Sequence, residues 1–406
     1  MNPKLREIEA HLVEHGGQVA ILLRDPLRLS DKAVLLPRRL APLLELCDGS
    51  RDEAELRAAL AVRAGISLTP RTLEQILAQL DKALLLDNER FARAREDALK
   101  AYRAAPHRSP ILAGEGYPAD PQELTRLLEG YMGAAWGVRP TEMRPDPSVR
   151  GLISPHIDFQ RGGLIYAQAW PRAAEAIRAA EIAIILGTDH ADGGGELTLT
   201  RQHYATPWGV LPTAQAVVEA VSQAIGPEAA FRDELHHRSE HSIELAAVWL
   251  HYYLRDGECE MVPILCGSFE PFVAGESGPD QAPRLSAAIE ALREATDHRR
   301  TLVIAAADLA HVGPAFGDPA PLDLVGRARL QAADERLIAA ICAGDAEGLF
   351  QEVKREGDRW RICGLPPIYL ALRLLGDTKG ELVGYAQCPA DPRGTSLVSI
   401  CGVLLR

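Results

Sequence analysis

The sequence predicts an α/β protein in which a central mixed sheet is flanked by helices, with a small α+β domain before it. Beyond residue 110, short apolar runs of strand length alternate with amphipathic stretches of helical length, which is the pattern of an α/β layer structure. Several of these runs end directly at His, Asp or Cys. Ligands of open α/β sheets bind beyond the carboxyl ends of the strands, so this pattern also indicates where a site would lie.

The elements of this larger domain follow from the periodicity of its apolar residues. Strands are expected near residues 150–153, 182–186, 261–265, 301–307, 381–387 and 397–404. Helices are expected at 121–133, 165–179, 213–225, 242–254, 280–295, 324–342 and 367–375. We therefore assign residues 110–406 to one α/β domain and residues 101–109 to a linker.

Residues 1–100 are expected to form a separate module. VAILLRD (19–25) and KAVLLP (32–37) read as short strands, and LLL at 84–86 could be another. Two helices follow from their start signals: Ser50 as N-cap with Glu53 in capping-box position, and Thr69 as N-cap with Pro70 in the first turn. Small helices with a terminal β-wing indicate a winged-helix-like α+β domain, or a small packing or dimerisation domain.

Composition limits the function classes. The 406 residues are 47% hydrophobic, which is ample for two domains, and the formal net charge is −12. An acidic chain gives no footprint for nucleic-acid binding. The seven cysteines are scattered without a CxxC pair, and no signal peptide or run of about 18 apolar residues occurs. A cytoplasmic protein with reduced thiols and no membrane span is expected.

Two histidines stand at the ends of successive expected strands. GLISPHIDF brings His156, and IAIILGTDH brings Asp189 and His190. Imidazoles from separate strand ends are typical metal ligands, although a single one could equally be a hydrogen-bonded loop residue. Cys363 precedes the expected helix GLPPIYLAL, where free N–H groups favour a thiolate, so it is a candidate ligand or nucleophile. The alternative is a buried, inert cysteine.

The stretch HHRSEHSIELAAVWL contributes Glu240 and His241. His237 and His241 are spaced i, i+4, which on a helix would present two ligands to one metal, but HRSEH is not the HExxH pattern of zincins. Ser239 or Ser242 is a candidate cap, which would place Glu240 and His241 at a helix start. There they could bind substrate or move protons, or they could belong to a capped, solvated face.

Asp308 and His311 lie three positions apart in AADLAHVG, so in a first helical turn they would share a face. The carboxylate could orient or ligate a metal and the imidazole could act as acid or base, or the pair could be an N-cap with an incidental histidine. GxGxxG, Walker and GxSxG motifs are absent from the sequence, so a nucleotide cofactor or a serine nucleophile elbow is not expected.

Taken together, these strings resemble the Memo family, known in bacteria as AmmeMemoRadiSam system protein B. The resemblance covers roughly residues 110–406 through GEGYPADPQEL, SPHIDFQRGG, ILGTDH, TPWGVLPT, EHSIELAAVWL, AADLAHVG, ICGLPPIYLAL and TSLVSICGVLL. It implies a fold like the class III extradiol dioxygenases, with His156, His190 and Cys363 as metal ligands. Asp308, His311, Glu240 and His241 would line the same pocket as catalytic groups.

The chain departs from the commoner family strings. It has PHIDFQRGG for PHAGYxYSG, GTDH for GPxH, and LPPI for RHPI, which puts charge from Asp158, Arg161 and Asp189 near the site. In the N-terminal module, LLPRRLAPLLELCDGSRDEAELRAAL resembles the PqqD-like domains, which are peptide-recognition modules of radical-SAM systems.

Two functions follow as expectations. The first is a non-haem metal enzyme, dioxygenase-like and acting with a radical-SAM system, that uses a divalent metal, with iron expected and copper or zinc as alternatives, on a small-molecule substrate. The second is a non-catalytic scaffold that binds a metal and recruits a peptide or radical-SAM partner through the N-terminal module. A hydrolase that uses Cys363 with a nearby histidine is a third reading, but the sequence has no local motif for it.

Overall fold

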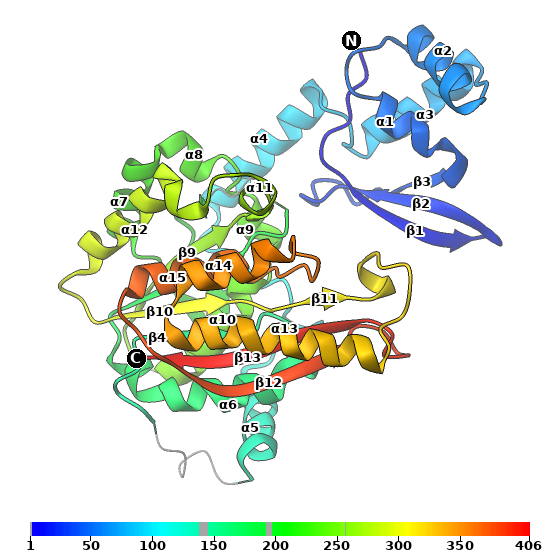
Figure 1. Cartoon of the computed structure of the whole chain (residues 1–406). Helices are drawn as coiled ribbons and strands as arrows, with labels where there is room; N and C mark the ends of the chain where they lie inside the picture. Colours follow the sequence, from blue (N-terminus) through cyan, green and yellow to red (C-terminus); the bar gives the residue numbers. More distant parts are fainter. Residues whose placement is uncertain (1, 138–144, 192–196, 256) are drawn as a thin grey trace. The chain divides into compact units, whose positions relative to one another are not determined.

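The chain forms two compact units, Met1–Ala105 and Pro106–Arg406, which are described separately. The structure is a computed structural model that describes residues 2–137, 145–191, 197–255 and 257–406 (Figure 1).

The N-terminal unit consists of a three-stranded antiparallel sheet in the order β1-β2-β3 and four α-helices. Its elements are β1 Glu9–His15, β2 Gln18–Arg24, β3 Val34–Pro37, α1 Ala41–Leu46, α2 Glu53–Ala64, α3 Pro70–Lys82 and α4 Glu89–Ala104. Leucines of β2, β3 and α1–α3 form its core.

The sequence did not predict β1, because EAHLVEH is exposed along almost its whole length and lacks an apolar alternation. Residues 84–86 contribute an isolated bridge between Leu86 and Leu5.

One of the expected helix starts needs correction. The N-cap of α2 is Asp52, whose carboxylate accepts the N–H groups of Ala54 and Glu55, and Glu55 completes the capping box. Ser50 is not the cap, because its hydroxyl bonds the Asp48 side chain in the preceding turn. The Thr69 cap of α3 is confirmed.

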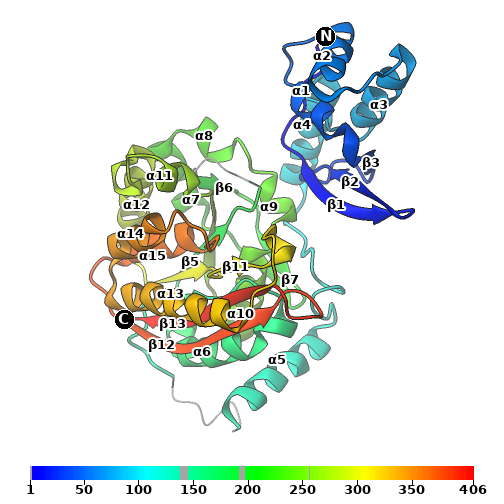
Figure 2. The same ribbon diagram turned by 45° about the vertical axis from the view of Figure 1, so that its right-hand side comes forward.

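The C-terminal unit contains a central mixed sheet, as predicted, and this sheet has eight strands among the described residues, where six strands were expected. Its strand order is β11-β13-β4-β10-β5-β9-β6, with β12 paired to β13, and β7 and β8 form a separate hairpin. The paired strands β12 and β13 lie side by side in Figure 2. The strands are β4 Gly151–Ser154, β5 Ile182–Thr188, β6 Leu197–Leu199, β7 Tyr204–Thr206, β8 Gly209–Leu211, β9 Glu260–Cys266, β10 Thr301–Ala306, β11 His311–Val312, β12 Gly380–Pro389 and β13 Leu397–Leu405. The helices are α5 Pro121–Trp136, α6 Phe159–Ala179, α7 Gln215–Ile225, α8 Pro227–Phe231, α9 His236–Ser239, α10 Ser242–Leu254, α11 Glu270–Ala274, α12 Pro283–Thr296, α13 Leu324–Ala343, α14 Ala346–Arg355 and α15 Leu365–Leu375.

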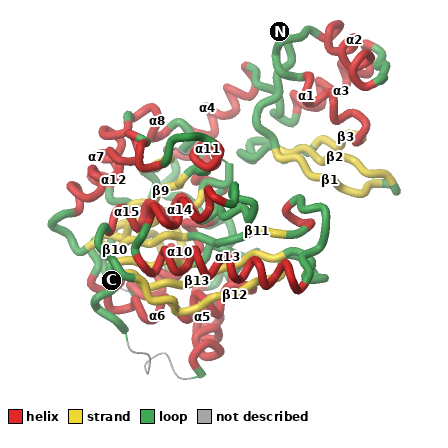
Figure 3. Tube along the Cα trace, viewed as in Figure 1, coloured by secondary structure: helices red, strands yellow, loops and turns green. Residues whose placement is uncertain are grey.

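Helices cover both faces of this sheet (Figure 3). Alternate residues of the buried strands point to opposite sides, so Ile184 joins the core with α7, α12, α13, α14 and α15, whereas Ile185 joins the core with α5, α6 and α10. Strands buried on both faces read as continuous apolar runs, which is why β5, β9 and β10 were predictable.

Four adjacent strands, β4, β10, β5 and β9, run parallel to one another. Their carboxyl ends therefore meet at one edge of the sheet, and the segments that follow them lie next to each other there. Among the described residues, no helix has the length and apolarity that crossing a bilayer would require.

Candidate metal centre

Three loops at this edge of the sheet bring together the expected ligands. His156 follows β4, His190 follows β5, and Asp308 follows β10, which lies between those two strands. Cys363 comes from the other end of the chain and stands just before α15, which packs on the sheet. One ligand atom from each of His156, His190 and Cys363 lies within 4.8 Å of the other two, so the three side chains could share one metal ion.

Both ring nitrogens of His156 have close neighbours. Its Nδ1 lies 2.9 Å from the carbonyl oxygen of Ala306, which can only accept, so Nδ1 carries a hydrogen and Nε2 is the nitrogen that can bind an ion once its proton is lost. Nε2 lies 3.4 Å from Sγ of Cys363. Asp308 accepts the backbone N–H groups of His156 and Ile157, and its other oxygen lies 3.7 Å from Nε2 of His156. Burial alone lowers the pKa of His156, but Asp308 and Cys363 outweigh it and raise the pKa to about 9.

Glu240 orients His190 in the same way. The buried Glu240 carboxylate lies 2.9 Å from Nδ1 of His190 and also accepts the His190 backbone N–H. A carboxylate on Nδ1 directs Nε2 of a histidine outward and makes it a better ligand. Burial opposes charge on both groups, but their mutual attraction outweighs it. It raises the pKa of His190 well above its ordinary value and holds that of Glu240 well below.

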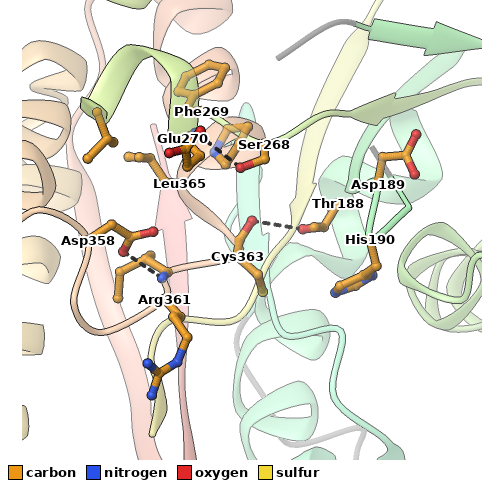
Figure 4. A pocket seen from close by; sticks show the side chains of 13 residues that line it. Thr188, Asp189, His190, Ser268, Phe269, Glu270, Asp358, Arg361, Cys363 and Leu365 are labelled. Carbon is orange, nitrogen blue, oxygen red and sulfur yellow. Dashed lines mark hydrogen bonds between the residues drawn. The ribbon is translucent and has the colours of Figure 1, made fainter. Parts of the chain in front are cut away.

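Among the residues that the structure describes, Cys363 is the cysteine that lies with these two histidines, and Figure 4 shows it opposite His190. Burial alone raises the pKa of a thiol, but the positive charges of His156 and His311 hold the pKa of Cys363 well below its ordinary value, which favours the thiolate. Gly364 allows this placement: its N–H donates to the Asp308 carbonyl at 3.0 Å, and a Cβ atom there would collide with that same oxygen.

The segment containing Glu240 and His241 differs from expectation. The helix is interrupted at these two residues, with α9 ending at Ser239 and α10 beginning at Ser242. Neither serine caps α10. The other oxygen of Glu240 accepts the N–H groups of His241 and Ser242, so Glu240 caps α10 while it holds His190. The His241 ring stacks on that of His190 at a centroid distance of 5.3 Å, which places it at the same site. His190, Glu240 and His241 also form a second group of possible ligands.

The suggested i, i+4 pair of His237 and His241 does not form, because α9 and α10 are separate helices. His237 is fully buried and bonds the Tyr204 hydroxyl and the Thr198 carbonyl. Asp189 is likewise engaged elsewhere, since its carboxylate lies 2.8 Å from Nδ1 of His236.

Asp308 and His311 do not lie in a helical turn. Asp308 is in the loop after β10, and His311 begins the short strand β11. Asp308 touches His156 directly, as described above. His311 approaches the site from the side of the loop before Cys363: its N–H bonds the Trp360 carbonyl, and its Nδ1 lies 3.2 Å from the Arg361 carbonyl.

A pocket of about 300 Å³ adjoins the candidate centre, with His190 and Cys363 in its wall (Figure 4). Its apolar lining comes from Phe269, Val273, Ile362, Leu365 and Pro366, and its polar lining includes Thr188, Asp189, Ser268, Glu270, Asp358 and Arg361.

Sequence reasoning missed the residues of the loop after β9. The signal was present, because β9 is parallel to β5 and ends at the same edge, but this loop carries no metal-ligating residue that would have drawn attention to it.

Fold and site together define an α/β protein with a candidate metal centre at the carboxyl edge of its parallel strands. The family model described as Memo-like protein matches residues 108–403. The chain therefore belongs to the Memo-like family.

The alignments with some relatives extend beyond residues 108–403. A MEMO1 family protein of Aquifex aeolicus is 26% identical over 410 residues, covering the whole of both chains. A MEMO1 family protein of Methanopyrus kandleri is 29% identical over 69% of this chain and 91% of its own. One from Thermus thermophilus is 27% identical over 82% of this chain and 92% of its own. The N-terminal unit is thus shared with the Aquifex relative.

Proposed function

We propose that this protein is a non-haem metal enzyme, dioxygenase-like in type, that acts with a radical-SAM system on a small molecule. His156, His190 and Cys363 hold a divalent metal, for which iron is the expected ion and copper or zinc the alternatives. The observation that carries the proposal is the convergence of three ligand atoms within 4.8 Å of one another.

The donor set fits a transition metal. Both histidines have Nδ1 engaged by an oxygen acceptor, which leaves Nε2 of each to bind an ion. A thiolate is a soft ligand that suits iron, copper or zinc and does not suit magnesium or calcium. Three protein ligands leave coordination positions open, and iron bound there would supply redox chemistry and a place for substrate to coordinate.

The surrounding residues supply proton transfer and substrate binding. The His241 side chain is 38% exposed and touches both the site and solvent, so it can exchange a proton with a bound substrate. His311 is the second candidate for this role. Asp308 and Glu240 fix the two histidine ligands. The apolar lining of the adjoining pocket suits the carbon skeleton of a small substrate.

Metal analysis tests the proposal. Full-length protein is purified anaerobically, and iron, copper and zinc are quantified in wild type, C363S and H190A. We expect about one metal per chain in wild type and its loss in both variants, with C342S and H298A as controls that remove a cysteine and an exposed histidine elsewhere. A wild-type protein that binds none of the three metals would refute the proposal.

The second candidate function is a non-catalytic scaffold, and the N-terminal unit favours it. We propose that this unit is a PqqD-like, winged-helix-like module that recruits a peptide or a radical-SAM partner. β1 is an edge strand with almost all of its residues exposed, and such an edge can pair with an added strand. Oxygen consumption by the iron-loaded protein with catechol-like compounds separates the two functions, since a scaffold would show none.

A further inference from the structure

A buried arginine lies behind the candidate metal centre. The Arg108 side chain is 1% exposed and is surrounded by acceptors. Its Nε donates to the His237 carbonyl at 2.8 Å, its Nη2 donates to the Glu240 carbonyl at 2.6 Å, and its Nη1 pairs with the Glu244 carboxylate. The guanidinium thus bonds the main chain of α9 at His237 and the main chain of the break between α9 and α10 at Glu240.

Glu244, the carboxylate that pairs with Arg108, also accepts several other hydrogen bonds. Glu244 accepts the N–H groups of Ile111 and Leu112, each at 2.9 Å, and the Tyr117 hydroxyl at 2.6 Å. Removing two charges from water costs several kcal/mol per ion unless geometry and further hydrogen bonds compensate. This network satisfies both partners, so it fixes one arrangement of residues 108–117 against α10.

Arg108 bonds the turn between α9 and α10, and Glu240 lies in this turn. The Glu240 main chain bonds Arg108, and its side chain bonds Nδ1 of His190 at 2.9 Å. A small rotation of this turn would move the carboxylate and with it the direction of Nε2 of His190. By bonding the carbonyls of His237 and Glu240, Arg108 therefore fixes the Glu240 carboxylate. This carboxylate in turn orients the ring of His190, the candidate ligand.

We propose that Arg108 is a positioning residue of the metal centre, acting through Glu240 on His190. The inference rests on the proposed metal-binding function. It makes the first residues of the C-terminal unit part of the frame of the site, although they contribute no ligand. Lysine cannot replace arginine here, because an ammonium has no planar fork with which to bond two carbonyls and a carboxylate at once.

The test is a titration of full-length apoprotein with Co²⁺, followed by the thiolate-to-cobalt charge-transfer band and the ligand-field bands. Loss of a group that orients a ligand costs roughly 10–100-fold in metal affinity, so R108K is expected to bind Co²⁺ about 10-fold more weakly and with shifted ligand-field bands. R406A is the matched control. Arg406 bonds Asp146 and Glu381 near the opposite end of the strands, so its loss should lower Tm and leave the cobalt spectrum unchanged.

A double-mutant cycle separates positioning from general destabilisation. If Arg108 acts through Glu240, the losses of Co²⁺ affinity in R108K and E240Q overlap, and the double variant is little worse than E240Q alone. If R108K does not fold, Glu244→Gln weakens the same pair with less disturbance and should shift the bands in the same direction. Wild-type affinity and spectrum in the folded variant would overturn the inference. Failure of the wild type itself to bind Co²⁺ would instead count against the proposed function.

Discussion

The carboxylate of Glu240 accepts the hydrogen on Nδ1 of His190 at 2.9 Å, and its second oxygen accepts the first free N–H groups of α10. One buried side chain thus orients a candidate ligand and caps a helix. The two tasks are mechanically linked, because the cap fixes the carboxylate and the carboxylate fixes the imidazole.

E240A is accordingly expected to lower metal affinity by roughly 10–100-fold, the usual effect of losing a carboxylate behind a histidine ligand. E240Q keeps an oxygen acceptor and should lose less. Calorimetric titration of the apoprotein with Zn²⁺ measures the effect. E219A removes an exposed glutamate that bonds Arg201 and should leave the affinity unchanged. Equal affinities in E240A and wild type would show that Glu240 does not act on the site.

Gly364 offers a steric test of how Cys363 is placed. In G364A the added methyl would meet the Asp308 carbonyl, so the Cys363 loop must move away from His156. Overpacking of this kind costs about 1–3 kcal/mol, and we expect lower Tm together with weaker metal binding. G130A is the control, because a Cβ atom added at Gly130 in α5 would meet no described atom within 4 Å apart from the backbone of its own helix, and alanine there should stabilise the helix slightly. Thermal unfolding and metal titration of both variants decide the matter.

Much of this candidate site could be predicted from the sequence, because its residues directly follow predicted strands or precede a predicted helix. Apolar runs buried on both faces identify the parallel strands, and parallel strands end at one edge, so His156 and His190 had to approach each other. Cys363 could be added from its position before a helix. Periodicity, the rule for strand ends and the position before a helix make these residues candidates, and the family resemblance is what joins them into one expected ligand set.

The rest depends on contacts that no local pattern encodes. Asp308 follows β10, as expected for a residue after a strand, but it was expected to share a helical turn with His311 and instead accepts the N–H of His156, a partner 152 positions away. Arg108 carries no motif, and its role follows from a network with residues more than 120 positions distant. Glu240 was recognised as a site residue, whereas its use as a helix cap depends on a break between α9 and α10 that helical periodicity does not reveal.

The pocket beside the centre can be tested without changing any of the proposed metal ligands. Val273 lines it from α11, and V273W would fill much of the 300 Å³ space with an indole. We expect V273W to bind metal like wild type and to lose binding of 4-methylcatechol to the metal-loaded protein, measured by titration calorimetry. V62W, which changes an exposed valine of the N-terminal unit, is the control. Unchanged catechol binding in V273W would place the substrate elsewhere.

A buried carboxyl outside the site should set a pH dependence of stability. Asp334 of α13 is fully buried and accepts the Tyr385 hydroxyl at 2.8 Å, and burial raises its pKa to about 6. The folded protein therefore binds this proton more tightly than the unfolded chain does. The contribution of Asp334 to stability is therefore largest below the unfolded pKa of about 4 and is lost as the pH rises from there through about 6. At about 1.4 kcal/mol for each pH unit, the loss is about 3 kcal/mol.

D334N removes this titration while keeping an acceptor for Tyr385. The free energy of unfolding of D334N should therefore be close to that of wild type at pH 4 and should exceed it above pH 6, by up to about 3 kcal/mol. Urea unfolding at a series of pH values, plotted as the difference between the two proteins, cancels the titration of all other groups. D323N is the control, because Asp323 is an exposed cap of the same helix and asparagine caps about equally well, so stability should change little and without this pH profile. A difference between D334N and wild type that stays constant from pH 4 to pH 8 would show that Asp334 is ionised in the folded state throughout, with its charge compensated by the protein.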